Sequence, residues 1–89
     1  MNRFHISLDV QEKVRLKVEG SGYIYVGTCK QNNNKDDDKL YLAIGYEEYD
    51  DSYCVWLFNN NGRIGILSDG TYNLSLKEML EEVAKRVEE

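Results

Sequence analysis

The sequence predicts an α+β fold: a curved antiparallel sheet of about six strands, open or partly closed into a barrel, followed by one C-terminal amphipathic helix. Two observations lead to this class. Short apolar segments follow one another from about residue 3 to about residue 73, separated by polar or glycine-containing turns. A capping box and a helical spacing of apolar side chains then mark residues 76–88. At this length we expect residues 1–89 to form a single domain.

The first two strands are predicted from alternation near the N-terminus. Apolar side chains occupy every second position over residues 4–10 and again over residues 13–19. Within the second segment, Val14, Leu16 and Val18 would point inward and the charged residues between them outward, as in a half-buried strand. Gln11 and Glu12 would join the two strands as a short hairpin.

The next three strands, residues 23–30, 40–46 and 53–58, are apolar on both faces. One alternating set is aliphatic. Because a half-solvated antiparallel strand is polar on its second face, the other set must be covered by a curled sheet, a second subunit or a partner. This other set, the aromatic face, consists of Tyr23, Tyr25, Gly27, Cys29, Tyr41, Ala43, Gly45, Cys54, Trp56 and Phe58.

The C-terminal third begins with turn signals and ends with the helix. Asn61 and Gly62 suit a type I′ hairpin turn, which predicts a sixth strand over residues 63–67. A turn at residues 69–70 and a short strand at residues 71–73 would follow. Ser75 and Glu78 form the capping box of the helix. Its apolar stripe, which we expect to cover the aliphatic face, consists of Leu76, Met79, Leu80, Val83 and Val87.

The charge distribution limits the classes of partner. The net charge is −5, and the acidic residues are concentrated between residues 31 and 60. This charge argues against direct nucleic-acid binding and against an anionic membrane surface, and it suits a protein partner with a basic surface. No apolar run approaches the roughly 20 residues of a membrane span. We expect a cytoplasmic protein in which Cys29 and Cys54 are free thiols, although neighbouring strands would allow a disulfide.

No pattern of residues in the sequence indicates an enzyme, a metal site or a cofactor site. His5, Ser7 and Asp9 have the composition of a catalytic triad, but successive side chains on one strand face lie about 7 Å apart, too far for a nucleophile and its base. The glycines at 20, 22 and 27 lack the spacing and the helix of a phosphate-binding loop. Asp36 to Asp38 lack EF-hand spacing. We therefore expect a non-enzymatic protein without cofactor or metal.

The first candidate binding surface is a pair of acidic loops. Their carboxylates could imitate the phosphates of a nucleic acid and occupy a basic groove, with tyrosine adding contact area at low entropic cost. The alternative is that both loops serve only solubility and protect the sheet edges. The candidate residues are Asp36, Asp37, Asp38, Glu47, Glu48, Tyr49, Asp50 and Asp51.

The second candidate is the aromatic face. Three interpretations remain open: the interior of a barrel, an interface with a partner or a second subunit, and a pocket for a flat ligand. Arg15, Lys17 and Arg63 could supply positive charge near such a pocket. The candidate residues are Tyr23, Tyr25, Tyr41, Trp56 and Phe58.

The leading functional hypothesis is an acidic interaction protein that binds and blocks or regulates another macromolecule. The chain has no proline and few alanines beside many asparagines, lysines and tyrosines, a bias typical of AT-rich genomes. Together with size and acidity, this bias favours a phage or mobile-element protein that inhibits a host defence nuclease, in the manner of an anti-CRISPR nucleic-acid mimic. A module that sequesters a small ligand or nucleotide and a homodimeric structural protein are the alternatives.

Overall fold

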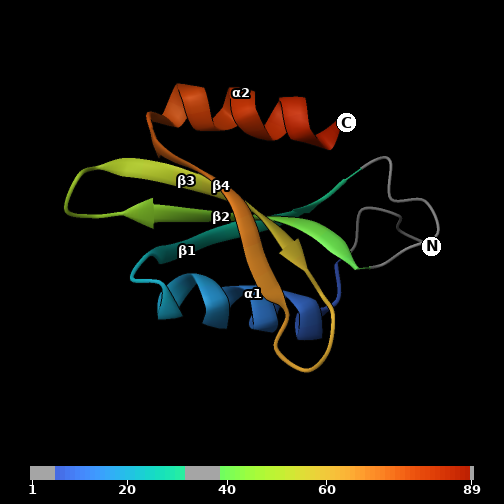
Figure 1. The fold of residues 1–89 in the computed structure, drawn as a ribbon. Coiled ribbons are helices and arrows are strands. Elements are labelled where there is room, and N and C mark those ends of the chain that lie inside the picture. Colours follow the sequence, from blue (N-terminus) through green and yellow to red (C-terminus); the bar gives the residue numbers. More distant parts are fainter. Residues whose placement is uncertain (1–5, 32–38, 89) are drawn as a thin grey trace.

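A helix, four consecutive strands and a second helix make up the fold. The computed structural model describes residues 6–31 and 39–88. The strands pair antiparallel in sequence order, so the sheet is an open meander and no barrel. The α+β class is confirmed, but the sheet has four strands where six were predicted. In chain order the elements are α1 (Leu8–Gly20), β1 (Ile24–Lys30), β2 (Leu40–Glu47), β3 (Ser52–Asn59), β4 (Ile66–Leu74) and α2 (Leu76–Val87) (Figure 1).

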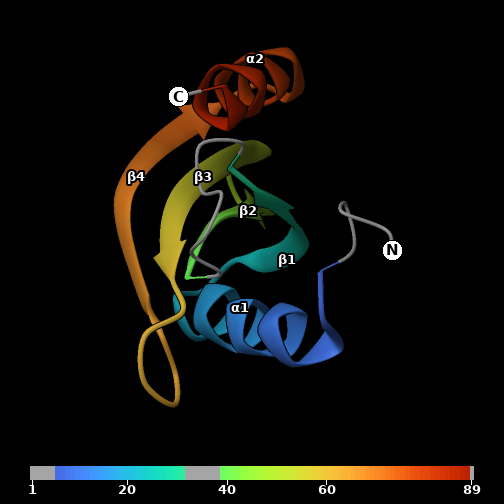
Figure 2. The ribbon, with the colours of Figure 1, turned by 90° about the vertical axis from the view of Figure 1, so that its right-hand side faces the viewer.

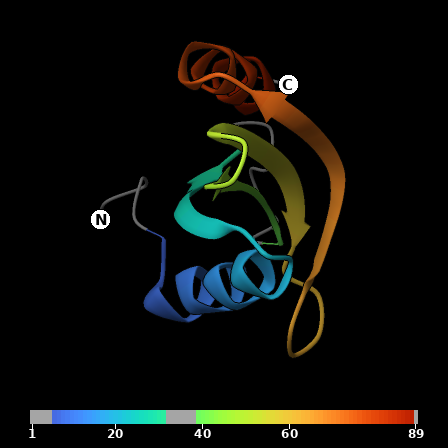
Figure 3. The ribbon, with the colours of Figure 1, turned by 90° about the vertical axis from the view of Figure 1, so that its left-hand side faces the viewer.

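The sheet lies between the two helices. Figures 2 and 3 show a strongly curved sheet with α1 on one face and α2 on the other. Helix α1 packs mainly on β1 and β2, whereas α2 packs mainly on β3. The long strand β4 sweeps along one side of the molecule between the levels of the two helices (Figure 2). Both faces of the sheet are thus covered by elements of the same chain.

Helix α1 stands where the sequence predicted two strands. Residues 8–20 form one helix, and residues 1–5 lie outside the described part of the chain. Val10, Val14 and Val18 are spaced four apart and are all buried, which is the pattern of one helical face. The predicted strand required the side chain of Leu16 to point inward, but this side chain is 57% exposed. The prediction was wrong because alternation over residues 14–18 concealed the helical spacing.

The start of α1 is fixed by Ser7. Its side-chain Oγ accepts a hydrogen bond of 3.2 Å from the backbone N–H of Val10, as an N-cap residue does. The carboxylate of Asp9 lies in the first turn, where the helix dipole favours negative charge. Ser7 and Asp9 are therefore helix-start residues, and the candidate strand that they shared with His5, which is not among the described residues, does not form.

Helix α1 covers the aromatic face, and a hydrophobic core lies between the helix and the sheet. The valines of α1 pack directly on the aromatic rings, so no second subunit is needed for this purpose. We call this cluster the α1 core. Its buried members are Val10, Val14, Val18, Tyr41, Ala43, Cys54, Trp56 and Phe58, with Ile6, Tyr23, Tyr25 and Leu67 packed at its margin.

Trp56 is the centre of the α1 core. Its ring lies over Gly45, where an added Cβ would come within 2.9 Å of the indole. Tyr23 meets the same ring edge to face, with centroids 4.9 Å apart. The indole Nε1–H donates to the hydroxyl of Tyr72 over 3.1 Å, so the buried polar atom is satisfied. Gly45 is thus required for close approach of the ring to the backbone.

The opposite face forms the α2 core, as the sequence predicted for the C-terminal helix. Its buried members are Ile44, Val55 and Met79, with Cys29, Tyr53, Leu74 and Val83 packed against them. The capping box is present, with Glu78 N–H donating to Ser75 Oγ (3.1 Å) and Ser75 N–H to Glu78 Oε1 (2.9 Å). Leu76 and Leu80, also expected in the stripe, remain more than half exposed.

Arg86 fastens α2 to the edge strand β4. Its guanidinium pairs with Glu82 at 2.7 Å on the same helix. It also donates to the backbone oxygen of Asp69 and to the hydroxyl of Thr71, each at 2.7 Å. The N–H groups of the planar guanidinium thus donate both to α2 and to β4. They help to hold residues 69–71 within β4, although the sequence predicted a turn at residues 69–70.

Strand β4 continues through two positions of irregular backbone. The sequence predicted a strand over residues 63–67 and a turn at residues 69–70, but β4 runs on to Leu74. Asp69 and Asn73 both have positive φ, which these short polar residues tolerate, and the pairing with β3 shifts register twice, once at each of these residues. The connection from β3 to β4 covers residues 60–65, where the sequence predicted a turn at residues 59–62, and it has positive φ at Gly62 and Gly65.

A β-bulge in β1 changes which face the following residues share. Tyr25 pairs with Gly45 and Gly27 pairs with Ile44, so Val26 is an extra residue. From this point the alternation is reversed, and Cys29 pairs with Leu42 on the α2 side. The prediction that Cys29 belongs to the aromatic face was therefore wrong. Cys54 lies in the α1 core, and both thiols are free.

Substitution of aspartate at positions 14 and 16 distinguishes the helix from the predicted strand. Val14 is fully buried, so Val14→Asp places an unpaired charge in the α1 core and should destabilise the fold by about 4 kcal/mol or more. Leu16→Asp lies on the exposed side of α1 and should change stability by only about 0.5 kcal/mol. Urea denaturation followed by circular dichroism measures both. Equal losses for the two variants would support the strand.

Truncation of Trp56 tests the α1 core. Trp56→Ala removes the ring that fills the space above Gly45 and should lower the free energy of unfolding by about 3–5 kcal/mol. Tyr49→Ala is the matched control, because this aromatic side chain is 94% exposed and its loss should cost only about 0.5 kcal/mol. A Trp56→Ala protein that melts at the temperature of the wild type would contradict the packing described here.

Candidate functional site

The turn between β2 and β3 concentrates exposed negative charge at one end of the molecule. We call this segment the acidic hairpin. It reaches beyond the ends of both helices, at the left of Figure 1. Four of its five residues are acidic, and the fifth, Tyr49, is 94% exposed. Its residues are Glu47, Glu48, Tyr49, Asp50 and Asp51.

Hydrogen bonds within the segment hold its shape. The hydroxyl of Tyr46 donates to Asp51 Oδ1 over 2.6 Å, across the base of the turn. The backbone N–H of Tyr49 donates to Glu47 Oε1 over 2.8 Å. Asp51 adopts a φ of 53°, which places it in the left-handed region that Asp tolerates. The carboxylates of Glu47 and Asp51 are therefore engaged in the turn itself.

Three side chains of the acidic hairpin are left for contacts with other molecules. Glu48, Tyr49 and Asp50 are exposed, and within the described residues none of their side chains forms a hydrogen bond or ion pair. The hairpin base is stiffened by Tyr46 and Tyr53, whose rings face each other across the strands with centroids 5.0 Å apart. A tyrosine flanked by two carboxylates is thus presented on an ordered support.

The acidic hairpin raises the pKa of the Tyr46 phenol. The hydrogen bond to the Asp51 carboxylate raises the pKa of Tyr46 to about 12, assisted by partial desolvation and by the neighbouring charges of Asp51, Tyr53 and Glu48. The phenol therefore remains a protonated donor at neutral pH. Because the hairpin itself contains no basic side chain, its negative charge is not neutralised locally.

The other acidic segment of the sequence belongs to the connection between β1 and β2. Asp36, Asp37 and Asp38 lie outside the described residues. The strand ends that flank them, Lys30 and Leu40, are at the opposite end of β2 from Glu47. An eight-residue strand spans roughly 26 Å, so the two acidic segments leave the sheet far from each other. The candidate site is therefore the hairpin at residues 47–51.

The aromatic face is occupied by α1. Tyr41, Trp56 and Phe58 are buried in the α1 core, and Tyr23 and Tyr25 are half-buried at its margin. These rings pack against valines of the same chain and present no open platform to a ligand. The spacing of Val10, Val14 and Val18 is the signal in the sequence that could have identified this cover.

The charges expected near a ligand at the aromatic face are placed elsewhere. Arg15 lies on the outer side of α1, where it pairs with Glu12 and, at 2.7 Å, with Glu19. These bonds lower the pKa of Glu12 and raise that of Arg15. Lys17 and Arg63 instead line a cavity beside α1, which sequence reasoning did not foresee.

The cysteines and acidic groups show no arrangement for metal binding. Among the described residues, no three His, Cys, Asp or Glu side chains are grouped so that they could hold an ion. Burial raises the pKa of Cys54 to about 12, and it also raises the pKa of Cys29. Both thiols thus remain protonated, and a thiolate is the form that acts as nucleophile or ligand.

Comparison with known proteins identifies no relative. No protein-family model matches the chain, and no match was found among curated proteins or solved structures. None of the helices in the described part of the chain is both long and apolar enough to cross a bilayer. What the acidic hairpin can do follows from its geometry and charge.

Removal of the Asp51 charge should change the titration of Tyr46. In Asp51→Asn the acceptor is neutral, so we expect the pKa of Tyr46 to fall from about 12 toward its ordinary value near 10. A phenol whose pKa is raised by folding stabilises the native state below about pH 10, and this contribution disappears as the pH rises toward 12.

A pH titration of the tyrosine Cζ resonances by NMR measures this shift. Asp69→Asn is the control, since it also removes one exposed carboxylate but lies on β4, and it should leave Tyr46 unchanged. A Tyr46 that titrates near pH 10 in the wild type would show that the hydrogen bond at the base of the hairpin is absent.

Proposed function

We propose that the protein is a non-enzymatic interaction protein, and that its acidic hairpin binds a basic surface of another macromolecule and so blocks or regulates it. One observation carries the proposal: the end of the sheet presents Tyr49, 94% exposed, between the carboxylates of Glu48 and Asp50, which have no partner among the described residues. An exposed aromatic side chain with unpaired acidic neighbours matches a basic partner both in charge and in contact area.

The order of the hairpin favours binding. The bonds of Tyr46 with Asp51 and of Tyr49 with Glu47 fix the turn before any partner arrives. Less conformational entropy is then lost on association than for a disordered acidic loop. The projection of the hairpin beyond both helices also allows it to enter a groove (Figure 1).

The kind of partner follows from the pattern of charge. Closely spaced carboxylates can take the places of phosphates in a groove that normally binds nucleic acid, where they pair with the same basic side chains. The finer form of the proposal is therefore an inhibitor, encoded by a phage or mobile element, that occupies the nucleic-acid groove of a defence nuclease. It rests on the acidity of the hairpin and on the composition of the chain.

Charge reversal at the tip tests the proposal. Glu48→Lys/Asp50→Lys alters the two acids that do not bond within the turn, so the hairpin should keep its shape. Wild type and variant are immobilised, and proteins from the organism that makes this chain are passed over them. We expect the wild type to retain a protein that nucleic acid displaces, and the variant to bind it at least about tenfold more weakly.

The control is a second double variant with the same change in net charge, at positions outside the acidic hairpin. Glu81→Lys/Glu88→Lys alters two exposed acids, one within α2 and one at its C-cap, and should retain the partner as the wild type does. Equal retention by the tip variant would remove the hairpin from the interaction. Loss in both variants would show that overall charge, and not this site, is responsible.

A further inference from the structure

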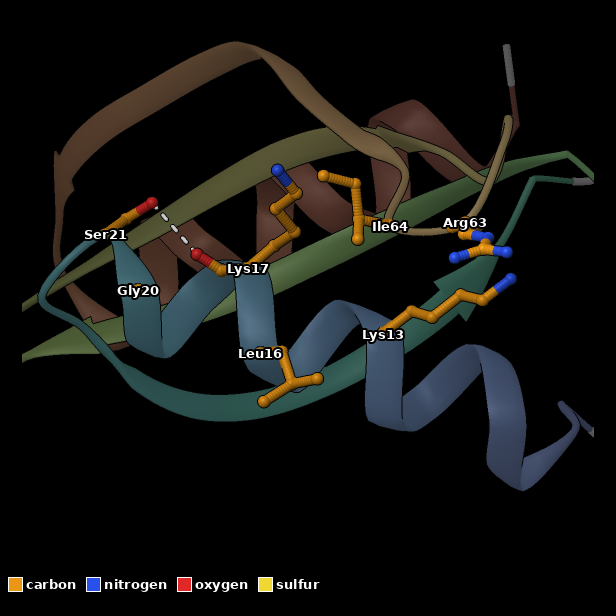
Figure 4. A pocket seen from close by; sticks show the side chains of 7 residues that line it. All are labelled: Lys13, Leu16, Lys17, Gly20, Ser21, Arg63 and Ile64. Carbon is orange, nitrogen blue, oxygen red and sulfur yellow. Dashed lines mark hydrogen bonds between the residues drawn. The ribbon is translucent and has the colours of Figure 1, made fainter.

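A cavity of about 370 Å³ lies beside α1, where the loop between β3 and β4 approaches the helix (Figure 4). Its volume is at the lower end of the range for small-molecule sites. It is distinct from the α1 core, because its walls come from the exposed flank of the helix and from the loop. The residues that line it are Lys13, Leu16, Lys17, Gly20, Ser21, Arg63 and Ile64.

The charge of this cavity is opposite to that of the whole protein. Its described lining includes three cations and no acid, although the chain carries a net charge of −5. Within the described residues, the ammonium group of Lys17 and the guanidinium of Arg63 have no hydrogen-bond or ion-pair partner. Like charges that share one cavity repel each other, and a bound anion would relieve this repulsion.

Of the three cations, Lys13 is the one that has partners among the described residues. Its ammonium group lies 3.4 Å from Asp9 Oδ2 and donates to Asn60 Oδ1 over 3.1 Å. Asn60 belongs to the chain segment that follows β3, so this bond ties the helix to the loop that carries Arg63. The cavity is therefore a position at which two distant segments are held together.

The remaining walls are apolar. Leu16 is 57% exposed and Ile64 is 66% exposed, and both flank the cavity. Gly20 presents no side chain, and the space above it is open. Figure 4 shows the charged ends of Lys13 and Arg63 at one end and Leu16 nearer the other, while Lys17 extends toward Ile64. Lys13 and Arg63 thus form a cationic end, and Lys17 lies farther along the cavity beside the apolar Ile64.

We propose that this cavity binds a small amphiphilic anion, with a single carboxylate or phosphate head group on an apolar body. The head group would lie at the end formed by Lys13 and Arg63, where its charge offsets their repulsion, and the positive charge of Lys17 farther along the cavity would add to the attraction. The apolar body would cover Leu16 and Ile64, which are otherwise in contact with water. The proposal does not depend on the function assigned to the acidic hairpin.

Calorimetric titration with defined amphiphiles tests the site. Decanoate and octyl phosphate, each below its micelle concentration, represent the two head groups. Decyltrimethylammonium has a similar tail with a positive head. We expect decanoate or octyl phosphate, or both, to bind with one molecule per chain, and the cationic amphiphile not to bind. Binding of one anion alone identifies the head group that the cavity accepts.

Two variants and one control locate the binding. Lys17→Glu/Arg63→Glu reverses the two unpartnered cations and should weaken binding at least about tenfold. Leu16→Asn leaves these cations in place, removes apolar contact and should also weaken it. Lys77→Glu/Lys85→Glu changes the net charge of the protein as the first variant does, but on exposed positions of α2, and should bind as the wild type does.

Three outcomes would overturn the proposal. The first is the absence of binding by both anionic amphiphiles to the folded wild type. The second is equal binding of the cationic amphiphile, which would indicate a nonspecific apolar contact. The third is an equal effect of the Lys17/Arg63 and Lys77/Lys85 variants, which would assign the effect to net charge. Circular dichroism melts of each variant confirm that the fold is retained.

Discussion

A sheet whose strands are apolar on both faces is stable in water only when both faces are covered, and this constraint shapes the whole protein. The two helices, one before and one after the strands, meet this requirement. Helix α1 supplies three valines to the aromatic side, and α2 supplies Met79 and Val83 to the aliphatic side. The two cores have different chemistry because the strands alternate between rings with small residues and branched aliphatic side chains.

The same constraint decides where function can reside. With both faces of the sheet covered, the larger side chains of β2 and β3 serve mainly as core, and the turns carry the exposed chemistry. The acidic hairpin is at one end of β3, and the segment that leads to Arg63 and Ile64 begins at the other. Negative charge and positive charge are thus separated along one strand.

The sequence predicted well where its signals were local. Ser75, Glu78 and the stripe after them specify α2, and the three central strands appear close to their predicted bounds. The N-terminal helix was missed because Leu16 alternates with two core valines although it points to solvent. The sequence therefore did not show which element packs on the aromatic face. The acidic hairpin was identified as a loop from its composition, whereas the cationic cavity depends on the contact of α1 with a loop distant in sequence.

The bulge in β1 has a consequence for how the chain must fold. It places Cys29 and Cys54 on opposite faces of strands that are separated by β2. Two strand spacings amount to about 10 Å, more than the roughly 7 Å between Cα atoms that a disulfide allows. A cross-link formed between these thiols in the unfolded chain is therefore incompatible with the native sheet and traps the molecule outside it. Reducing conditions protect the folding pathway of this protein, even though neither cysteine takes part in the surfaces described above.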